Sequence, residues 1–188
     1  MAGEAPFSDV HARTNRLEVL VDSVRFLLAG DVVGADNQVM PRTLRASAGG
    51  YCYHALNRGN ERSRVFHDAD DCNAFVASLR AGCARVPMRL IGFCVLPNHF
   101  HLVLRPYEDG DLSVWMQWLL TSHAHGYRKR YRGSGHVWQG RFRSFPIEEN
   151  QHLLTVLRYV ERNPLRAGLV THAQDWHGRA FPYVSIRR

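Results

Sequence analysis

The alternation of apolar and polar residues along the chain predicts a series of β-strands. A β-prone aromatic run over residues 51–56 ends at a turn signal and predicts the first strand. Two apolar runs, residues 88–96 and 99–105, are separated by Pro97-Asn98, a pattern typical of a hairpin. Residues 137–147 predict a further strand.

Apolar residues that recur with a helical period predict helices between and after these strands. The first helix follows the acidic residues at 68–71, which offer negative charge to its N-terminus. A second helix is predicted over residues 111–130, whose last turn is basic. A third is predicted over residues 148–163, and Pro164 is expected to end it. Residues 16–29 also favour a short helix.

The order of these elements, β-α-β-β-α-β-α, predicts an α+β fold of the ferredoxin-like type. The strands of such a fold form one antiparallel sheet, and we expect the helices to pack on one of its faces. The opposite face of the sheet would then be open. We expect this open face to hold the functional site.

Charge divides the chain near Met40. Residues 1–39 carry six acids and three bases, whereas residues 40–188 carry eleven acids and twenty-one bases. We therefore expect an N-terminal extension of uncertain order at 1–39 and one basic domain at 40–188 that suits a polyanionic partner. No apolar run approaches the roughly 18 to 20 residues of a membrane span, so we expect no membrane partner and a cytoplasmic protein.

A pair of histidines is the first candidate for chemistry. His99-Phe100-His101 lies on a predicted strand, where alternate side chains share a face, so both imidazoles point the same way and suit a divalent metal. The alternative is a pair of surface histidines on an edge strand. His123 and His125 are also two residues apart, but they lie on a predicted helix and are expected to be solvated. We expect His54 to be a surface or hydrogen-bonded structural histidine.

Tyr159 and Asn163 are the second candidate. They are four residues apart on the third predicted helix and therefore lie on one helical face. An amide oxygen can ligate a metal, but Asn163 before a proline also suits an ordinary helix stop, and Tyr159 could be a core aromatic. Tyr127 and Tyr131 are rival reactive tyrosines, but no amide or carboxylate follows either of them at four residues.

A basic and aromatic segment over residues 127–143 suits single-stranded nucleic acid, whose bases stack while cations neutralise its phosphates. The alternative is a solvated helix end with core aromatics, among them Trp138. The predicted DNA contacts, which include one arginine outside this segment, are Arg58, Arg128, Lys129, Arg130, Arg132, His136, Arg141 and Arg143.

Three motifs in order carry a resemblance to a known family. They are His99-Phe100-His101, then the run Gly135-His136-Val137-Trp138-Gln139-Gly140-Arg141-Phe142, then Tyr159-Val160-Glu161-Arg162-Asn163-Pro164. Together they resemble the REP-associated tyrosine transposases, which belong to the HUH nucleases. The resemblance spans roughly residues 40 to 170 and implies the HUH nuclease core.

The resemblance implies a chemistry. His99, His101 and Asn163 would hold Mg²⁺ or Mn²⁺, and Tyr159 would cut single-stranded hairpin DNA through a 5′-phosphotyrosine that allows rejoining. Members act as monomers or as homodimers, and the sequence leaves this open. Two alternatives remain, a catalytically inactive single-stranded DNA- or RNA-binding module and a zinc hydrolase using His99 and His101.

Overall fold

The structure is a computed structural model that describes residues 47–148 and 151–180. All of these residues belong to one unit of the chain, Leu44–Arg188. The expected N-terminal extension, residues 1–39, and the helix expected over residues 16–29 lie outside the described residues. The division of the chain at residue 40 therefore stays a prediction.

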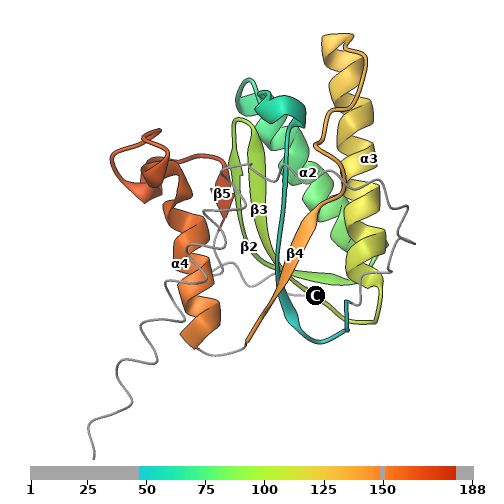
Figure 1. Ribbon diagram of the computed structural model, residues 1–188, viewed down its shortest axis with the longest axis vertical. Helices are drawn as coiled ribbons and strands as arrows, with labels where there is room; N and C mark the ends of the chain where they lie inside the picture. The colour runs from blue at the N-terminus through green and yellow to red at the C-terminus, as the bar shows by residue number, and fades with distance from the viewer. Residues whose placement is uncertain (1–46, 149–150, 181–188) are drawn as a thin grey trace, which may run out of the picture. The chain divides into compact units, whose positions relative to one another are not determined.

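The strands form one sheet in which every neighbouring pair is antiparallel. Its strand order is β4-β1-β3-β2-β5 (Figure 1). The hairpin predicted around Pro97-Asn98 is confirmed, because β2 and β3 pair on either side of this turn. The strands are β1 (Cys52–Arg58), β2 (Met88–Leu96), β3 (His99–Pro106), β4 (Arg143–Ile147) and the short β5 (Arg179–Ala180).

The predicted β-α-β-β-α-β-α order is confirmed by helices α2 (Ala69–Arg85), α3 (Asp111–Tyr131) and α4 (Gln151–Arg166). The predicted acidic start of α2 is also confirmed, since the Asp68 carboxylate accepts a hydrogen bond from the backbone N–H of Asp71 at 2.9 Å. The short 3₁₀ helices η1 and η2 cover 60–62 and 173–175. None of the described helices has the length and apolar character needed to cross a membrane.

Helices cover both faces of the sheet. Helices α2 and α3 pack on one face, and α4 lies on the opposite side (Figure 1). The α+β class is as predicted, but the face expected to be open is covered by α4. The reason is the apolar stripe of α4, which includes Val156 and Val160 and packs against Cys94 and Val103 of the sheet. The larger core lies on the α2–α3 face, around Phe75, Phe100 and Trp115.

The strand predicted over residues 137–147 is wrong in its first half. Only 143–147 form β4, and Trp138 makes a single isolated bridge to Gly59. Val137, Trp138 and Phe142 are nevertheless buried in the larger core. The apolar residues of this loop face the core, and their sequence pattern is therefore the same as that of a strand.

The prediction that Pro164 ends the third helix is also wrong, because α4 continues to Arg166. A proline inside a helix has no N–H for the carbonyl of the residue four positions earlier, here Val160. The side-chain amide of Asn163 donates to the Tyr159 carbonyl at 2.9 Å and, more weakly, to the Val160 carbonyl at 3.5 Å. The side-chain N–H of Asn163 thus takes the place of the N–H that Pro164 lacks, and the helix continues past the proline.

Candidate active site

The two histidines of the pair share one face of the sheet, as strand alternation predicted, and this face is the one that α4 covers. On β3, His99, His101 and Val103 share the α4 face of the sheet, whereas Phe100 points into the larger core. The rings of His99 and His101 lie 5.1 Å apart between centroids. The pair lies on a central strand of the sheet, and His101 is fully buried. The alternative of two surface histidines on an edge strand is therefore wrong.

His54 of β1 joins this pair. Its Nε2 lies 2.9 Å from Nδ1 of His101, and the two rings stack with centroids 5.1 Å apart. Both side chains are buried. His54 was expected to be a surface or hydrogen-bonded structural histidine, and the structure shows it hydrogen-bonded next to the candidate site. Strand alternation places it on the face of Leu56, but only the β1–β3 register, which pairs Leu56 with His101, brings it to the histidine pair.

A hydrogen-bond partner fixes the tautomer of His99. His99 Nδ1 lies 2.7 Å from the amide oxygen of Asn98, which can only accept, so Nδ1 donates and Nε2 keeps its lone pair. His101 Nδ1 is next to His54, while its buried Nε2 has no hydrogen-bond partner among the described residues. His99 Nε2 can therefore serve as a metal ligand, and His101 Nε2 can do so in the tautomer in which His101 Nδ1 donates to His54.

Burial keeps these imidazoles neutral. It lowers the pKa of His54 to about 4, and burial followed by the charge of Arg58 lowers the pKa of His99 to about 4. The pKa of His101 lies well below its ordinary value because of burial and then the neighbouring His54, His99 and Arg58. At neutral pH all three rings thus present lone pairs rather than positive charge.

Tyr159 is the candidate tyrosine that lies against the histidines. Its ring centroid is 5.9 Å from that of His101 and 6.1 Å from that of His54. Tyr127 and Tyr131 instead contact His67, with centroids 5.9 and 4.6 Å apart. The Tyr131 hydroxyl also donates to the Asp71 carboxylate at 2.6 Å, and this bond raises the pKa of Tyr131 to about 12. That environment disfavours a phenolate.

The surroundings of Tyr159 act on its pKa in opposite directions. Burial raises the pKa of the phenol above its ordinary value, and the charge of Arg166 and a hydrogen bond with Asn163 offset this rise only in part. The Arg166 guanidinium carbon lies 5.4 Å from the centre of the Tyr159 ring. Arg166 was not predicted as part of the site, because the helix was expected to end at Pro164.

Asn163 is buried one helical turn after Tyr159. Its amide nitrogen is used by backbone carbonyls, so its Oδ1 is the atom left to ligate. Within residues 47–148 and 151–180, no group of three or more His, Cys, Asp or Glu could hold a metal ion. The side-chain oxygen of Asn163 is nevertheless of a kind that divalent metals accept as a ligand. The zinc-hydrolase alternative gains no support.

Comparison with known proteins identifies the family. Residues 48–163 match the family model described as "Transposase IS200 like", which is more than half of the chain. The chain belongs to this transposase family. A Haemophilus influenzae protein assigned to the REP-associated tyrosine transposases is 29% identical over 130 residues, 63% of this chain and 70% of that protein.

A solved structure of a REP-associated tyrosine transposase bound to a REP hairpin has the same fold. It matches with a TM-score of 0.63 and 23% identity, covering 76% of this chain and 83% of that one. The resemblance drawn from the three ordered motifs is thus confirmed.

Two of the predicted DNA contacts of this transposase-family chain lie beside the histidines. Arg58 is the last residue of β1 and lies directly opposite His99, and Arg143 of β4 is opposite Leu56. Burial, and then the positive charges of Arg62 and Arg143, lower the pKa of Arg58. Positively charged side chains that lie close together repel one another, so an anionic group bound between them would be stabilised.

The other predicted contacts gather at the end of α3 and in the loop after it. Arg128 and His136 line a cavity of about 220 Å³ together with Asn60 and Arg64. Arg130 is held by Asp68 at 2.6 Å and by Asp71 at 3.2 Å. The remaining three, which are all exposed, are Lys129, Arg132 and Arg141.

Trp138 and His123 pack against each other in this region. Trp138 is buried in the larger core, as its core alternative proposed. His123, expected to be solvated, packs against Phe66 and Trp138 with centroids 5.1 and 4.9 Å apart. Burial lowers its pKa to about 4. The expectation failed because α3 turns this position toward the core, while His125 is exposed.

Proposed function

We propose that this chain cuts and rejoins single-stranded hairpin DNA through a covalent link to Tyr159. The observation that carries the proposal is the position of Tyr159 against His101 and His54, while the rival tyrosines, Tyr127 and Tyr131, contact His67 instead. Membership of the IS200-like transposases supports the reaction class. The comparison structure is described as bound to a REP hairpin, which supports a hairpin substrate here.

The residues fit a divalent metal such as Mg²⁺ or Mn²⁺. The buried His101 Nε2 without a partner among the described residues is the kind of atom that a bound cation satisfies. His99 Nε2 and the Asn163 side-chain oxygen would complete a set of nitrogen and oxygen ligands. When bound, the ion would polarise the scissile phosphate and offset the charge on its oxygens.

Tyr159 supplies the nucleophile in this proposal. Its Oη attacks the phosphorus, the bond from phosphorus to the 3′-oxygen breaks, and the 3′-oxygen takes up a proton to leave as a hydroxyl. Arg166 favours the phenolate form of Tyr159. The phosphotyrosyl link keeps the energy of the phosphodiester bond, so a second 3′-hydroxyl can reverse the step and join strands.

Cations beside the histidines and at the end of α3 give the strand a path. Arg58 and Arg143 lie beside the site, and the cavity lined by Arg64 and Arg128 lies past η1. Arginine contacts to phosphates are released as salt rises, so binding should weaken steeply with ionic strength.

A covalent adduct tests this function. The chain is incubated with labelled single-stranded hairpins that carry unpaired flanks of varied sequence, with Mg²⁺, Mn²⁺ or EDTA. We expect a DNA–protein band that survives denaturation, appears with either metal and is absent with EDTA. Tight hairpin binding without any adduct, across a randomised flank library, would instead favour the inactive binding module.

His54 gives a prediction about metal affinity. In this proposal His54 accepts a hydrogen bond from His101 Nδ1, 2.9 Å away, and so orients the His101 ring with Nε2 toward the metal. Loss of such a supporting partner typically weakens metal binding about 10- to 100-fold. We expect His54→Phe, which keeps an aromatic ring but removes the acceptor, to weaken Mn²⁺ binding by this factor, measured from the free-Mn²⁺ signal in electron paramagnetic resonance.

Two variants control this experiment. His54→Gln restores an acceptor and should recover part of the affinity, while His67→Phe changes an exposed histidine beside Tyr127 and should leave Mn²⁺ binding unaltered. Wild-type Mn²⁺ affinity in His54→Phe would mean that His54 does not position His101.

A further inference from the structure

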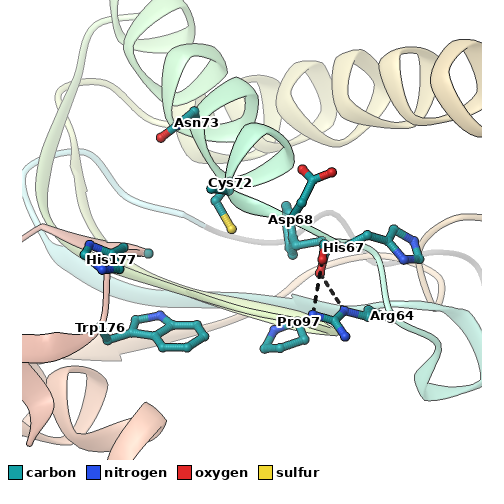
Figure 2. Close-up of a pocket in the computed structure, with 11 residues that line it drawn as sticks. Arg64, His67, Asp68, Cys72, Asn73, Pro97, Trp176 and His177 are labelled. Carbon is teal, nitrogen blue, oxygen red and sulfur yellow. Dashed lines mark hydrogen bonds between the residues drawn. The ribbon is translucent and has the colours of Figure 1, made fainter. Parts of the chain in front are cut away.

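A second cavity lies beside the turn between β2 and β3. It has a volume of about 270 Å³ and mainly apolar walls. Trp176 and Pro97 lie on one side of it, and Cys72 and Asn73 of α2 lie on the other (Figure 2). We call this cavity the tryptophan pocket. Its volume falls below the roughly 300 to 1,000 Å³ of pockets for drug-sized ligands, so it suits a single planar ring system.

The Trp176 indole, which forms one side of the tryptophan pocket, is held in place by the sheet. Trp176 Nε1 donates to the Val95 carbonyl at 2.8 Å, and the Val95 N–H donates to the Gly178 carbonyl at 2.7 Å. A Cβ at Gly178 would lie 2.6 Å from the Val95 carbonyl oxygen, so only glycine allows this close approach. The indole is therefore presented as a fixed surface on which a ring can stack.

Polar groups at this pocket can read the edge of a ring. Asn73 and His177 line it, and neither makes a hydrogen bond or ion pair with another described residue. Arg64 is held at the pocket by the carbonyls of Phe66 and His67 at 3.0 and 3.3 Å (Figure 2). The Asp68 carboxylate is neutralised by Arg130. An uncharged ring that carries hydrogen-bond donors and acceptors and is attached to a phosphate would match these polar groups.

The pocket is continuous with the proposed DNA path. Arg64 lines both the tryptophan pocket and the cavity at the end of α3. Pro97 is two residues before His99, and Trp176 packs in the same apolar cluster as Tyr159. In the proposed function, a strand that runs from the histidines toward the turn between β2 and β3 would pass this opening.

From these observations we propose that the tryptophan pocket receives one unpaired nucleobase of the DNA strand, stacked on Trp176 and contacted by Asn73 and His177. This inference rests on the proposed function. It adds a site at which one base beside the cleavage point is read, because an unstacked base offers both a ring face and a hydrogen-bonding edge.

Coupled substitutions in protein and DNA test the pocket. In a Tyr159→Phe background, hairpin binding is measured with a single abasic nucleotide placed at each unpaired position in turn. We expect one position at which the abasic nucleotide weakens binding, by roughly 5- to 150-fold, the range of base–aromatic stacking. Trp176→Ala should weaken binding of the intact hairpin similarly and remove the effect of the abasic nucleotide at that position only. Trp176→Phe, which keeps a stacking ring, should preserve the effect of the abasic nucleotide at that position.

Two measurements avoid reliance on Trp176, which also anchors its segment to β2. Asn73→Ala, on the exposed side of α2, should change the order of preference among the four bases at the coupled position. Bound hairpin should also slow alkylation of Cys72, which lines the pocket, but not that of the half-buried Cys83 on the same helix. Tyr107→Ala, at an exposed aromatic in another loop, should leave all abasic effects unchanged.

The outcomes separate this inference from the proposed function. Hairpin binding and adduct formation with no position coupled to Trp176, and with Cys72 still freely alkylated, would overturn the base pocket alone. Absence of any hairpin binding or adduct in the wild-type chain would overturn the proposed function and the pocket with it.

Discussion

Replacing Tyr159 with phenylalanine is expected to abolish the covalent DNA–protein adduct while hairpin binding is kept. The change removes only the hydroxyl oxygen, and the ring can keep its place against His101 and His54. Removing the nucleophile of a covalent catalyst costs roughly 10⁴- to 10⁶-fold in rate, so no adduct should be detectable on a denaturing gel. Fluorescence anisotropy with the same labelled hairpin checks that affinity is unchanged.

Tyr127→Phe is the matched control for this experiment. Its hydroxyl lies 3.1 Å from Nε2 of the exposed His67, so its loss should leave the fold and the adduct intact. Full adduct formation by Tyr159→Phe would show that another residue is the nucleophile. Loss of the adduct in Tyr127→Phe would point to the α3 tyrosines instead.

Replacing His101 with alanine is expected to remove both Mn²⁺ binding and cleavage. The variant lacks the Nε2 atom that is proposed to bind the metal. A bound metal contributes several kcal/mol by stabilising charge on the phosphate that is transferred. We expect cleavage at least about 100-fold slower, since each factor of ten corresponds to about 1.4 kcal/mol. Hairpin affinity in EDTA should stay within a few-fold of the wild-type value, because the cations along the path are unchanged.

The burial of His101 calls for a second variant. An alanine there leaves a cavity, so a thermal melt must show that the variant still folds. His99→Ala removes the other proposed ligand from a less buried position and should give the same loss of metal and cleavage. His125→Ala, at an exposed histidine, should behave as wild type. Normal Mn²⁺ affinity in both His99→Ala and His101→Ala would refute the metal site.

Much of the fold could be predicted from local patterns. Strand alternation placed His99 and His101 on one face, and the acidic start of α2 was visible at Asp68. These features depend on residues close in the chain, for which periodicity and capping are direct physical signals. The relation of Tyr159 to Asn163 likewise follows from helical spacing.

Features that depend on distant contacts could not be predicted. His54 reaches His101 only through the β1–β3 register, which the sequence of neither strand specifies alone. The apolar run from Val137 to Phe142 packs in the core without pairing, a case that periodicity does not distinguish from a strand. The extension of α4 past Pro164 to Arg166 is accompanied by a weak hydrogen bond from the Asn163 side-chain amide to the Val160 carbonyl, a contact that no periodic pattern predicts.

That amide places two demands on a single position of the chain. Position 163 must donate hydrogen to carbonyls of its own helix and, in the proposed site, offer an oxygen to a cation. An ionised aspartate would supply the oxygen without the donor, alanine would supply neither, and glutamine carries both groups on a longer arm. Mutational tolerance at this position should therefore be narrow, and a substitution there would disturb helix shape and ligand chemistry at once.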